Sequence, residues 1–164
     1  MQSVVENLNE TFEATADAVA RARSRLADFA AAVGATDSQT DAVRLAASEA
    51  VTNSVLHAYR GEAGPVYVSA ALVSGELWIQ IADDGCGLKP RADRPGLGVG
   101  LGLISQVSDD FAIVCRASGG TEVRIRFHLP GPETPEQTGS RDRQRRSDIG
   151  GRRHPSSPAP ASIA

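Results

Sequence analysis

The chain has 164 residues, 41% of them hydrophobic and 23% charged, and its formal net charge is −3. This length and composition fit a single soluble domain that is large enough to bury a core. Residues 1–130 carry 11 basic and 16 acidic side chains, whereas residues 131–164 carry 6 and 4. A mildly acidic main part argues against nucleic acid as a direct partner.

Cysteine content and hydropathy exclude further classes. Two cysteines, Cys86 and Cys115, are too few for a disulfide framework or a four-cysteine zinc site. The first ten residues have neither the basic start nor the apolar centre of a secretory signal. No apolar run approaches the length that crosses a bilayer. We therefore expect a cytoplasmic protein that makes no membrane contact.

Apolar periodicity predicts two helices early in the chain. Residues 3–13 allow a short edge strand. From residue 15 to 33 the apolar positions recur at offsets of 3, 7, 10, 11 and 14, which is the pattern of an amphipathic helix. The next helix runs to about Tyr59, with Asp37 or Ser38 as its cap.

The period then changes to two, which indicates strands. Residues 66–72 and 77–83 form a predicted hairpin. A short helix over 101–107 precedes strands over 111–115 and 121–127. Helices gathered early and strands gathered late predict an α+β fold, with the helices on one face of a mostly antiparallel sheet.

Beyond Pro130 the composition changes. Six of the nine prolines lie from Pro130 onward, among serine, glycine and arginine. Such a segment buries too little apolar surface to offset the entropy of ordering it. We expect one domain over residues 1–130, followed by a disordered tail over 131–164.

Glu49 and Asn53 lie four residues apart in the helix stretch RLAASEAVTNSVLHAY, so they share a face. A carboxylate and a carboxamide held side by side are oxygen ligands of the kind that Mg²⁺ prefers. The carboxylate could alternatively orient or deprotonate a nucleophile, and a merely solvated face is the third interpretation. Beside this face runs the predicted apolar stripe: Val43, Ala47, Ala50, Ser54 and Ala58.

Asp83 ends the second strand with the parity of its apolar face, where a carboxylate is costly unless a group donates to it. The exocyclic amine of adenine is one such donor. Gly85 and Gly87 let the backbone turn and approach a flat ligand closely. Thr121 has the inward parity of the last strand, so it faces the same side of the sheet as Asp83. A plain Asp-Gly turn and a strand-start threonine are the alternative readings.

A glycine at every second position marks the run GLGVGLGL from Gly96 to Leu103. Consecutive free N–H groups that lead into a helix form an anion cradle. The run is neither a P-loop nor the dinucleotide fingerprint, since the lysine of the first and the spacing of the second are missing. A flexible loop is the alternative interpretation.

Four motifs follow one another in the chain: Glu49-x-x-x-Asn53, Asp83-x-Gly85-x-Gly87, Gly98-x-Gly100-x-Gly102 and Gly120-Thr121. Together they resemble the GHKL (Bergerat-fold) ATPases, which include histidine kinases, Hsp90-type chaperones and mismatch-repair ATPases. The compact form and the wording SEAVTNSVLHAY are most similar to the anti-sigma factor serine-protein kinases. The resemblance covers about residues 10–128.

The resemblance implies a two-layer α+β sandwich with helices on one face of a mixed, mostly antiparallel sheet. It implies ATP and Mg²⁺ as cofactors, with Asn53 holding the metal and Glu49 as the catalytic carboxylate. Asp83 would bind the adenine amino group with support from Thr121. Residues 88–102 would form the ATP lid and phosphate loop. The remaining implied nucleotide-binding residues are Gly85, Gly87, Arg94, Gly98, Val99, Gly100, Leu101 and Gly102.

The resemblance also implies an activity and partners. The protein would be an anti-sigma factor that binds a sigma factor and phosphorylates a serine of a small antagonist protein, and relatives commonly form homodimers. A nucleotide-dependent binding module without phosphotransfer and a histidine-kinase-like ATPase domain are the alternatives.

The lid departs from the family pattern, and His57 has no role assigned by it. The lid from Leu88 to Leu97 is shorter than in many relatives. Lys89, Arg91 and Arg94 are available to contact the γ-phosphate, and Arg94 is the nearest of them to the second glycine box. His57 follows Asn53 by one turn, where packing or helix stabilisation is the expected role rather than catalysis.

Overall fold

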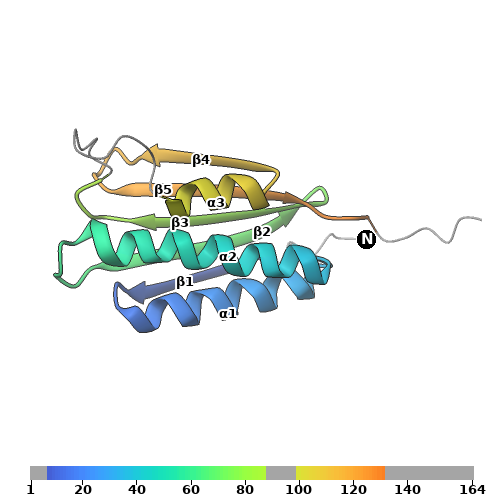
Figure 1. Cartoon of the computed structure of the whole chain (residues 1–164), viewed down its shortest axis with the longest axis horizontal. Helices are drawn as coiled ribbons and strands as arrows, with labels where there is room; N and C mark the ends of the chain where they lie inside the picture. Colours follow the sequence, from blue (N-terminus) through green and yellow to red (C-terminus); the bar gives the residue numbers. More distant parts are fainter. Residues whose placement is uncertain (1–6, 88–98, 132–164) are drawn as a thin grey trace, which may run out of the picture. The chain divides into compact units, whose positions relative to one another are not determined.

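The computed structural model describes residues 7–87 and 99–131 (Figure 1). Its elements in chain order are β1 (Asn7–Glu13), α1 (Ala16–Ala32), α2 (Asp37–Asn53), the π-helical turn η1 (Ser54–Ala58), β2 (Pro65–Val73), β3 (Glu76–Asp83), α3 (Val99–Val107), β4 (Asp110–Cys115) and β5 (Thr121–His128). The predicted order of helices and strands is confirmed, including the edge strand near the start of the chain.

The strands form a five-stranded sheet in the order β1-β2-β3-β5-β4. The helices α1, α2 and α3 cover one face of it (Figure 1). The predicted two-layer α+β sandwich is therefore confirmed. All four pairings between described strands are antiparallel, rather than mixed. Because β5 lies between β3 and β4, the first residue of β5 comes next to the last residues of β3.

Strand alternation and helix periodicity build the core between the layers. The main inward core residues of β2, β3 and β5 are 5% exposed or less, and small side chains on α1 and α2 let these helices approach closely. A buried Leu or Ile side chain stabilises the fold by about 1.5–3 kcal/mol. The main core residues are Leu26, Ala30, Val43, Ala47, Ala50, Val66, Val68, Leu77, Ile79, Ile81, Val123, Ile125 and Phe127.

Thr36 caps α2, where the sequence had suggested Asp37 or Ser38. Its backbone is extended and its hydroxyl accepts from the Gln39 amide at 3.2 Å, while the Gln39 side chain accepts from the Thr36 amide at 3.1 Å. This is a complete capping box. The Gln39 amide group also donates to the carbonyl of His128 at 2.7 Å, which ties the start of α2 to the end of β5.

Three further expectations concern the end of the second helix, the C-terminal tail and membrane spans. The second helix reaches the predicted end near Tyr59 through η1 rather than as a regular α-helix. Of the predicted tail, Gly131 is described and residues 132–164 lie outside the described residues, so the tail's disorder stays a prediction. Within the described ranges, no helix has the length and apolar character to cross a bilayer.

Candidate functional site

The carboxylate of Asp83 is 4% exposed and lies on the helix-facing side of β3. Its Oδ1 accepts from the amides of Gly85 at 3.1 Å and Thr121 at 3.2 Å, and its Oδ2 accepts from the Ser54 hydroxyl at 2.9 Å. These donors offset the cost of burying a charge. An ionised carboxylate has about four acceptor positions. One position on Oδ2 is therefore not used by the described residues.

Three separate segments supply those donors, and the fold explains why they meet. Antiparallel pairing sets Ala82 opposite Glu122, so Thr121 stands beside Asp83. Ser54 is the first residue of η1, and sequence reasoning placed it on the apolar stripe without a role. A single hydroxyl in an otherwise apolar stripe, directly after Asn53, was the signal that could have found it.

The turn after β3 packs against η1 so closely that glycine is required. A Cβ on Gly85 would lie 2.3 Å from the Ala58 carbonyl oxygen, and the Cys86 amide donates to that oxygen at 2.9 Å. Gly87 has a φ of +69° and Gly120 a φ of +82°. The close approach at Gly85 is thus to the protein's own helix end, whereas the sequence suggested an approach to a ligand. The π-helical turn is a structure found often at functional sites.

Glu49 and Asn53 are both partly buried on α2. The Glu49 carboxylate reaches the first turn of α3, where a Cβ on Gly100 would lie 2.0 Å from its Oε2. The Asn53 Nδ2 is buried without a hydrogen-bond partner among the described residues. A buried carboxamide of this kind favours a bound ligand, and its oxygen and nitrogen exchange places on a half-turn of the amide.

The glycine run is helical where it is described, whereas the sequence suggested a phosphate loop. Val99, Gly100, Leu101 and Gly102 form the first turn of α3. Leu101 is 5% exposed in the core, so its backbone alone is available to a ligand. The helix predicted over 101–107 is present, and it begins two residues earlier, at Val99. The first N–H groups of a helix have no intrahelical partner. The N–H groups that we expected to bind an anion therefore belong to the first turn of α3 and not to a preceding loop.

The remaining predicted site residues lie outside the described residues or away from the core. Arg94 and Gly98, with the rest of the lid over 88–98, lie outside the described residues. His57 is exposed in the last turn of η1, so it does not pack into the core. Among the described residues, no group of three or more His, Cys, Asp or Glu side chains could hold a metal by itself.

Two tyrosines and an ion pair surround the turn after β3, and sequence reasoning missed them. The Tyr59 hydroxyl donates to the Pro65 carbonyl at 2.5 Å and accepts from the Asp84 amide at 2.8 Å, and burial raises the pKa of Tyr59 above its ordinary value. The Tyr67 hydroxyl donates to the Asp84 carboxylate, and this hydrogen bond raises the pKa of Tyr67. Asp84 also pairs with Arg116. These contacts depend on packing between residues that are far apart in the sequence, so no local sequence pattern predicts them.

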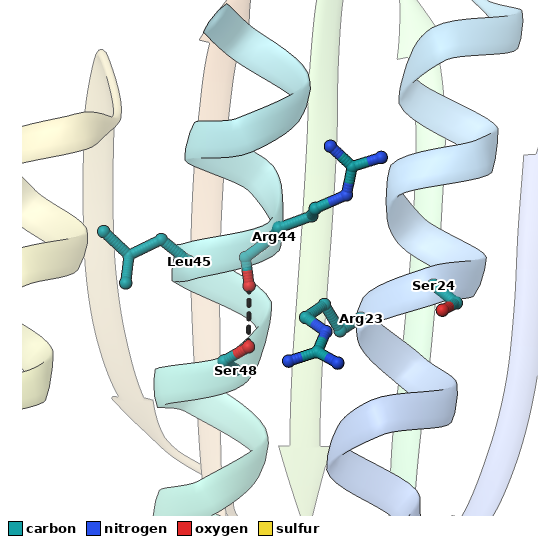
Figure 2. Close-up of a pocket in the computed structure, with 5 residues that line it drawn as sticks. All are labelled: Arg23, Ser24, Arg44, Leu45 and Ser48. Atoms are coloured by element: carbon teal, nitrogen blue, oxygen red, sulfur yellow. Dashed lines mark hydrogen bonds between the residues drawn. The ribbon is translucent and has the colours of Figure 1, made fainter. Parts of the chain in front are cut away.

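A second surface feature is an open basic groove of about 480 Å³ between α1 and α2 (Figure 2). Arg23 and Ser24 line it from α1, and Arg44, Leu45 and Ser48 line it from α2. Arg44 pairs with Asp41 at 2.7 Å, and the Ser48 hydroxyl donates to the Arg44 carbonyl at 2.8 Å. No carboxylate in the described ranges pairs with Arg23.

The fold and the buried carboxylate define a class of nucleotide-binding domain, and comparison with known proteins gives the family. The model of the histidine kinase-like ATPase domain matches residues 12–127, from β1 to β5. The chain belongs to this family. The resemblance read from the four sequence motifs is thereby confirmed.

The chain is also similar to individual proteins, at identities below 30%. The chain is 29% identical over 113 residues to the anti-sigma F factor of Clostridium acetobutylicum, covering 62% of this chain and 79% of the relative. It is 28% identical over 136 residues to that of Halalkalibacterium halodurans, covering 74% and 92%. A crystal structure of the RsbU and RsbW domains of a Mycobacterium tuberculosis protein superposes with a TM-score of 0.60 at 27% identity, over 77% of this chain and 33% of that one. The chain thus spans about a third of that solved chain.

Proposed function

We propose that the protein binds ATP with Mg²⁺ and acts as an anti-sigma factor that phosphorylates a serine of a small antagonist protein. The observation that carries the nucleotide assignment is the buried Asp83 carboxylate, which keeps one acceptor position on Oδ2. The partners are inferred from relatives named anti-sigma F factors and from the similarity to the solved chain with an RsbW domain. A sigma-factor partner would place the protein in the cytoplasm.

Asp83 would select adenine by charge complementarity. The exocyclic amine of adenine donates a hydrogen bond to Oδ2, whereas guanine and hypoxanthine present a carbonyl oxygen at the same ring position. Two acceptors facing each other in a buried site repel, which disfavours those bases. Thr121 supports this selection through its backbone amide, which holds Oδ1.

The residues present fit Mg²⁺ held jointly with the nucleotide. Asn53 supplies a partly buried carboxamide whose Nδ2 has no partner in the described ranges, so its oxygen can face the metal. Phosphate oxygens and waters complete the shell that Mg²⁺ prefers. When bound, Mg²⁺ neutralises charge on the phosphates during transfer. The first N–H groups of α3, from Val99 to Gly102, would also stabilise the negative charge of the phosphates by donating hydrogen bonds to them.

Glu49 is assigned as the catalytic carboxylate that orients or deprotonates the serine hydroxyl of the antagonist. Its carboxylate lies beside Gly100 at the start of α3, next to the N–H groups assigned to the phosphates. Gly98 and the γ-phosphate contact of Arg94 remain proposals carried by the family resemblance.

The groove between α1 and α2 is the surface we assign to a protein partner. Arg44 and Ser48 already have partners, whereas the Arg23 guanidinium is not paired with a carboxylate in the described ranges. Arg23 beside the Ser24 hydroxyl suits a carboxylate presented by an acidic segment, because arginine binds carboxylates in a forked geometry (Figure 2). Arg23→Glu should weaken partner binding, while ATP affinity holds, because the groove residues make no contact with Asp83.

The test of nucleotide recognition uses Asp83→Asn. The amide oxygen of the new side chain must face the amides of Gly85 and Thr121, so its NH₂ group faces the base. The Ser54 hydroxyl can turn to accept, which preserves the fold. We expect ATP affinity to fall by about 10- to 100-fold, the loss of one charge-assisted hydrogen bond plus one repulsive contact.

Calorimetry with ATP, GTP and ITP measures the effect. The wild type should prefer ATP, and Asp83→Asn should abolish that preference, because hypoxanthine's carbonyl can accept from the new amide. Equal wild-type affinity for ATP and ITP overturns the adenine assignment. Labelled ATP, Mg²⁺ and candidate antagonists then test transfer, and sigma-factor binding with ATP but without transfer would favour the binding module over the kinase.

A further inference from the structure

The turn that carries Asp83 is held from the outer side of the sheet by a cluster of three side chains, Arg116, Asp84 and Tyr67. The Arg116 Nη1 donates to the Asp83 carbonyl oxygen at 2.9 Å and pairs with the Asp84 carboxylate. The Tyr67 hydroxyl donates to the other carboxylate oxygen of Asp84 at 2.7 Å. The guanidinium lies 5.4 Å from the centroid of the Tyr67 ring, within cation–π range.

Arg116 links two segments that both reach the Asp83 carboxylate. It directly follows β4, and its amide donates to the Gly120 carbonyl at 3.2 Å, so it is part of the turn that leads into Thr121. Its side chain binds the carbonyl of Asp83 at the end of β3. The amide of Thr121 binds Oδ1 of the same residue. One arginine thereby fixes the distance between the carboxylate and one of its donors.

Asp84 is held at three points. Its amide donates to the Tyr59 hydroxyl at 2.8 Å, and its two carboxylate oxygens bind Arg116 and Tyr67. An arginine that binds a fully held carboxylate and a main-chain carbonyl has little freedom to move. The peptide between Asp83 and Asp84 is therefore fixed from the outer side of the sheet, while the buried Asp83 side chain lies on the helix-facing side.

A second ion pair on the same side of the sheet supplies the comparison. Arg124 pairs with Glu122 at 2.5 Å within β5. Both arginines are partly exposed, with side chains 28% and 46% accessible for Arg116 and Arg124. Exposed ion pairs contribute little to stability by themselves. The difference is that Arg116 binds the backbone of Asp83, whereas Arg124 pairs within its own strand.

We propose that Arg116 is a positioning residue for base recognition: held by Asp84 and Tyr67, it sets the Asp83 carboxylate at the angle that adenine requires. The residue does not touch the ligand and acts through the backbone of Asp83. The inference rests on the proposed adenine site. Loosening this contact lowers the affinity for a base that uses Asp83 and leaves the affinity for a base that does not.

The experiment compares Arg116→Ala with Arg124→Ala in the full chain. ATP and ITP affinities are measured by calorimetry, and unfolding by urea is followed through Trp78, the single tryptophan. Arg116→Ala should weaken ATP binding by about 3- to 10-fold, the range of coupling through a neighbouring residue, with ITP affinity unchanged. Arg124→Ala should change neither affinity. Arg116→Lys should restore part of the ATP preference, because an ammonium can still donate to the Asp83 carbonyl.

Amide hydrogen exchange gives a readout that needs no nucleotide. The amides of Gly85 and Thr121 donate to Asp83 Oδ1, so Arg116→Ala should speed their exchange while the mid-strand amide of Ile125 keeps its rate. Equal losses of ATP and ITP affinity, or unchanged exchange at Gly85 and Thr121, overturn the positioning role. A wild type that shows no preference for ATP over ITP refutes the adenine site itself, and the exchange result then separates that failure from a failure of the Arg116 contact.

Discussion

Asp83 and Asn53 belong to the base half and the phosphate half of the proposed nucleotide site, and the protein satisfies their polar groups to different extents. Asp83 receives three donors from three segments. Asn53 ends α2 with its Nδ2 buried and without a partner among the described residues. The fold thus supplies most partners of the base half and leaves one acceptor position on Asp83 Oδ2 for a ligand, whereas the buried Nδ2 in the phosphate half has no protein partner among the described residues. Changes in the first half should cost stability, and changes in the second should cost chemistry.

The largest expected effect is on phosphoryl transfer, in the phosphate half. Glu49→Gln keeps the size of the side chain and removes the charge that orients or deprotonates the serine. Transfer to a cognate antagonist should fall by about 100-fold or more, the usual contribution of a positioned general base. The affinity for Mg·ATP should stay close to that of the wild type, as calorimetry can show. Transfer at the wild-type rate would remove Glu49 from the mechanism.

Alanine substitutions at two glycines, one in each half, test the predicted difference in stability. Gly120 has a φ of +82°, and a Cβ there would lie 2.0 Å from the Asp83 carbonyl oxygen. Gly120→Ala should lower the free energy of unfolding by about 2–4 kcal/mol, from backbone strain and overpacking together. At Gly102, inside α3, such a Cβ would meet no heavy atom within 4 Å among the described residues outside its own stretch of helix. Gly102→Ala should raise the free energy of unfolding by up to about 1 kcal/mol.

Urea unfolding followed at Trp78 measures both glycine variants in the same way. Losses of equal size in the two variants would contradict the distinction between a base half that is built by close packing and a phosphate half that is not.

Asn53→Ala separates metal binding from base binding. The variant should lose the tightening of ATP binding by Mg²⁺, by about 10-fold, because an oxygen ligand is gone. Its free energy of unfolding should hold or rise, since a buried amide without a partner is itself destabilising. Asp83→Asn, in contrast, should lose affinity equally with Mg²⁺ and with EDTA. Calorimetry in both buffers decides, and an equal loss for Asn53→Ala in both would end its role as a ligand of the metal.

The smallest effect concerns alkaline pH and the turn after β3. Burial raises the pKa of Tyr59 above its ordinary value of 10.0, so the folded state holds this proton more tightly than the unfolded state. The stabilisation is complete below the unfolded pKa and is lost as pH rises through the folded pKa. The free energy of unfolding should therefore decline above about pH 10, and less steeply in Tyr59→Phe. Identical pH profiles for the two proteins would show that Tyr59 does not contribute.

Sequence patterns could predict what depends on local periodicity. The two-residue period of the strands gave the inward side of Asp83 and Thr121, and the helical period gave the shared face of Glu49 and Asn53. The cap at Thr36 was missed, because the two residues after it are also good caps. The helix over 101–107 was predicted, but its first two residues, Val99 and Gly100, were missed because they lie in the glycine run.

Contacts set by strand order could not be predicted at all. Arg116 reaches Asp83 and Asp84 because β5 lies between β3 and β4, and nothing near residue 116 in the sequence indicates that neighbour. The Ser54 hydroxyl bond depends in the same way on how η1 meets the end of β3.

The position of β5 in the sheet also has a consequence for synthesis of the chain. β5 is the last of the described strands to leave the ribosome, yet it pairs between β3 and β4, and its first amide is one of the donors to Asp83. A nascent chain that stops before β5 has every proposed catalytic residue but an incomplete base site, with one donor to the Asp83 carboxylate missing. Pairing between segments this far apart forms late, because loop closure precedes any gain from contact. Nucleotide binding at Asp83 should therefore appear only when translation has passed His128.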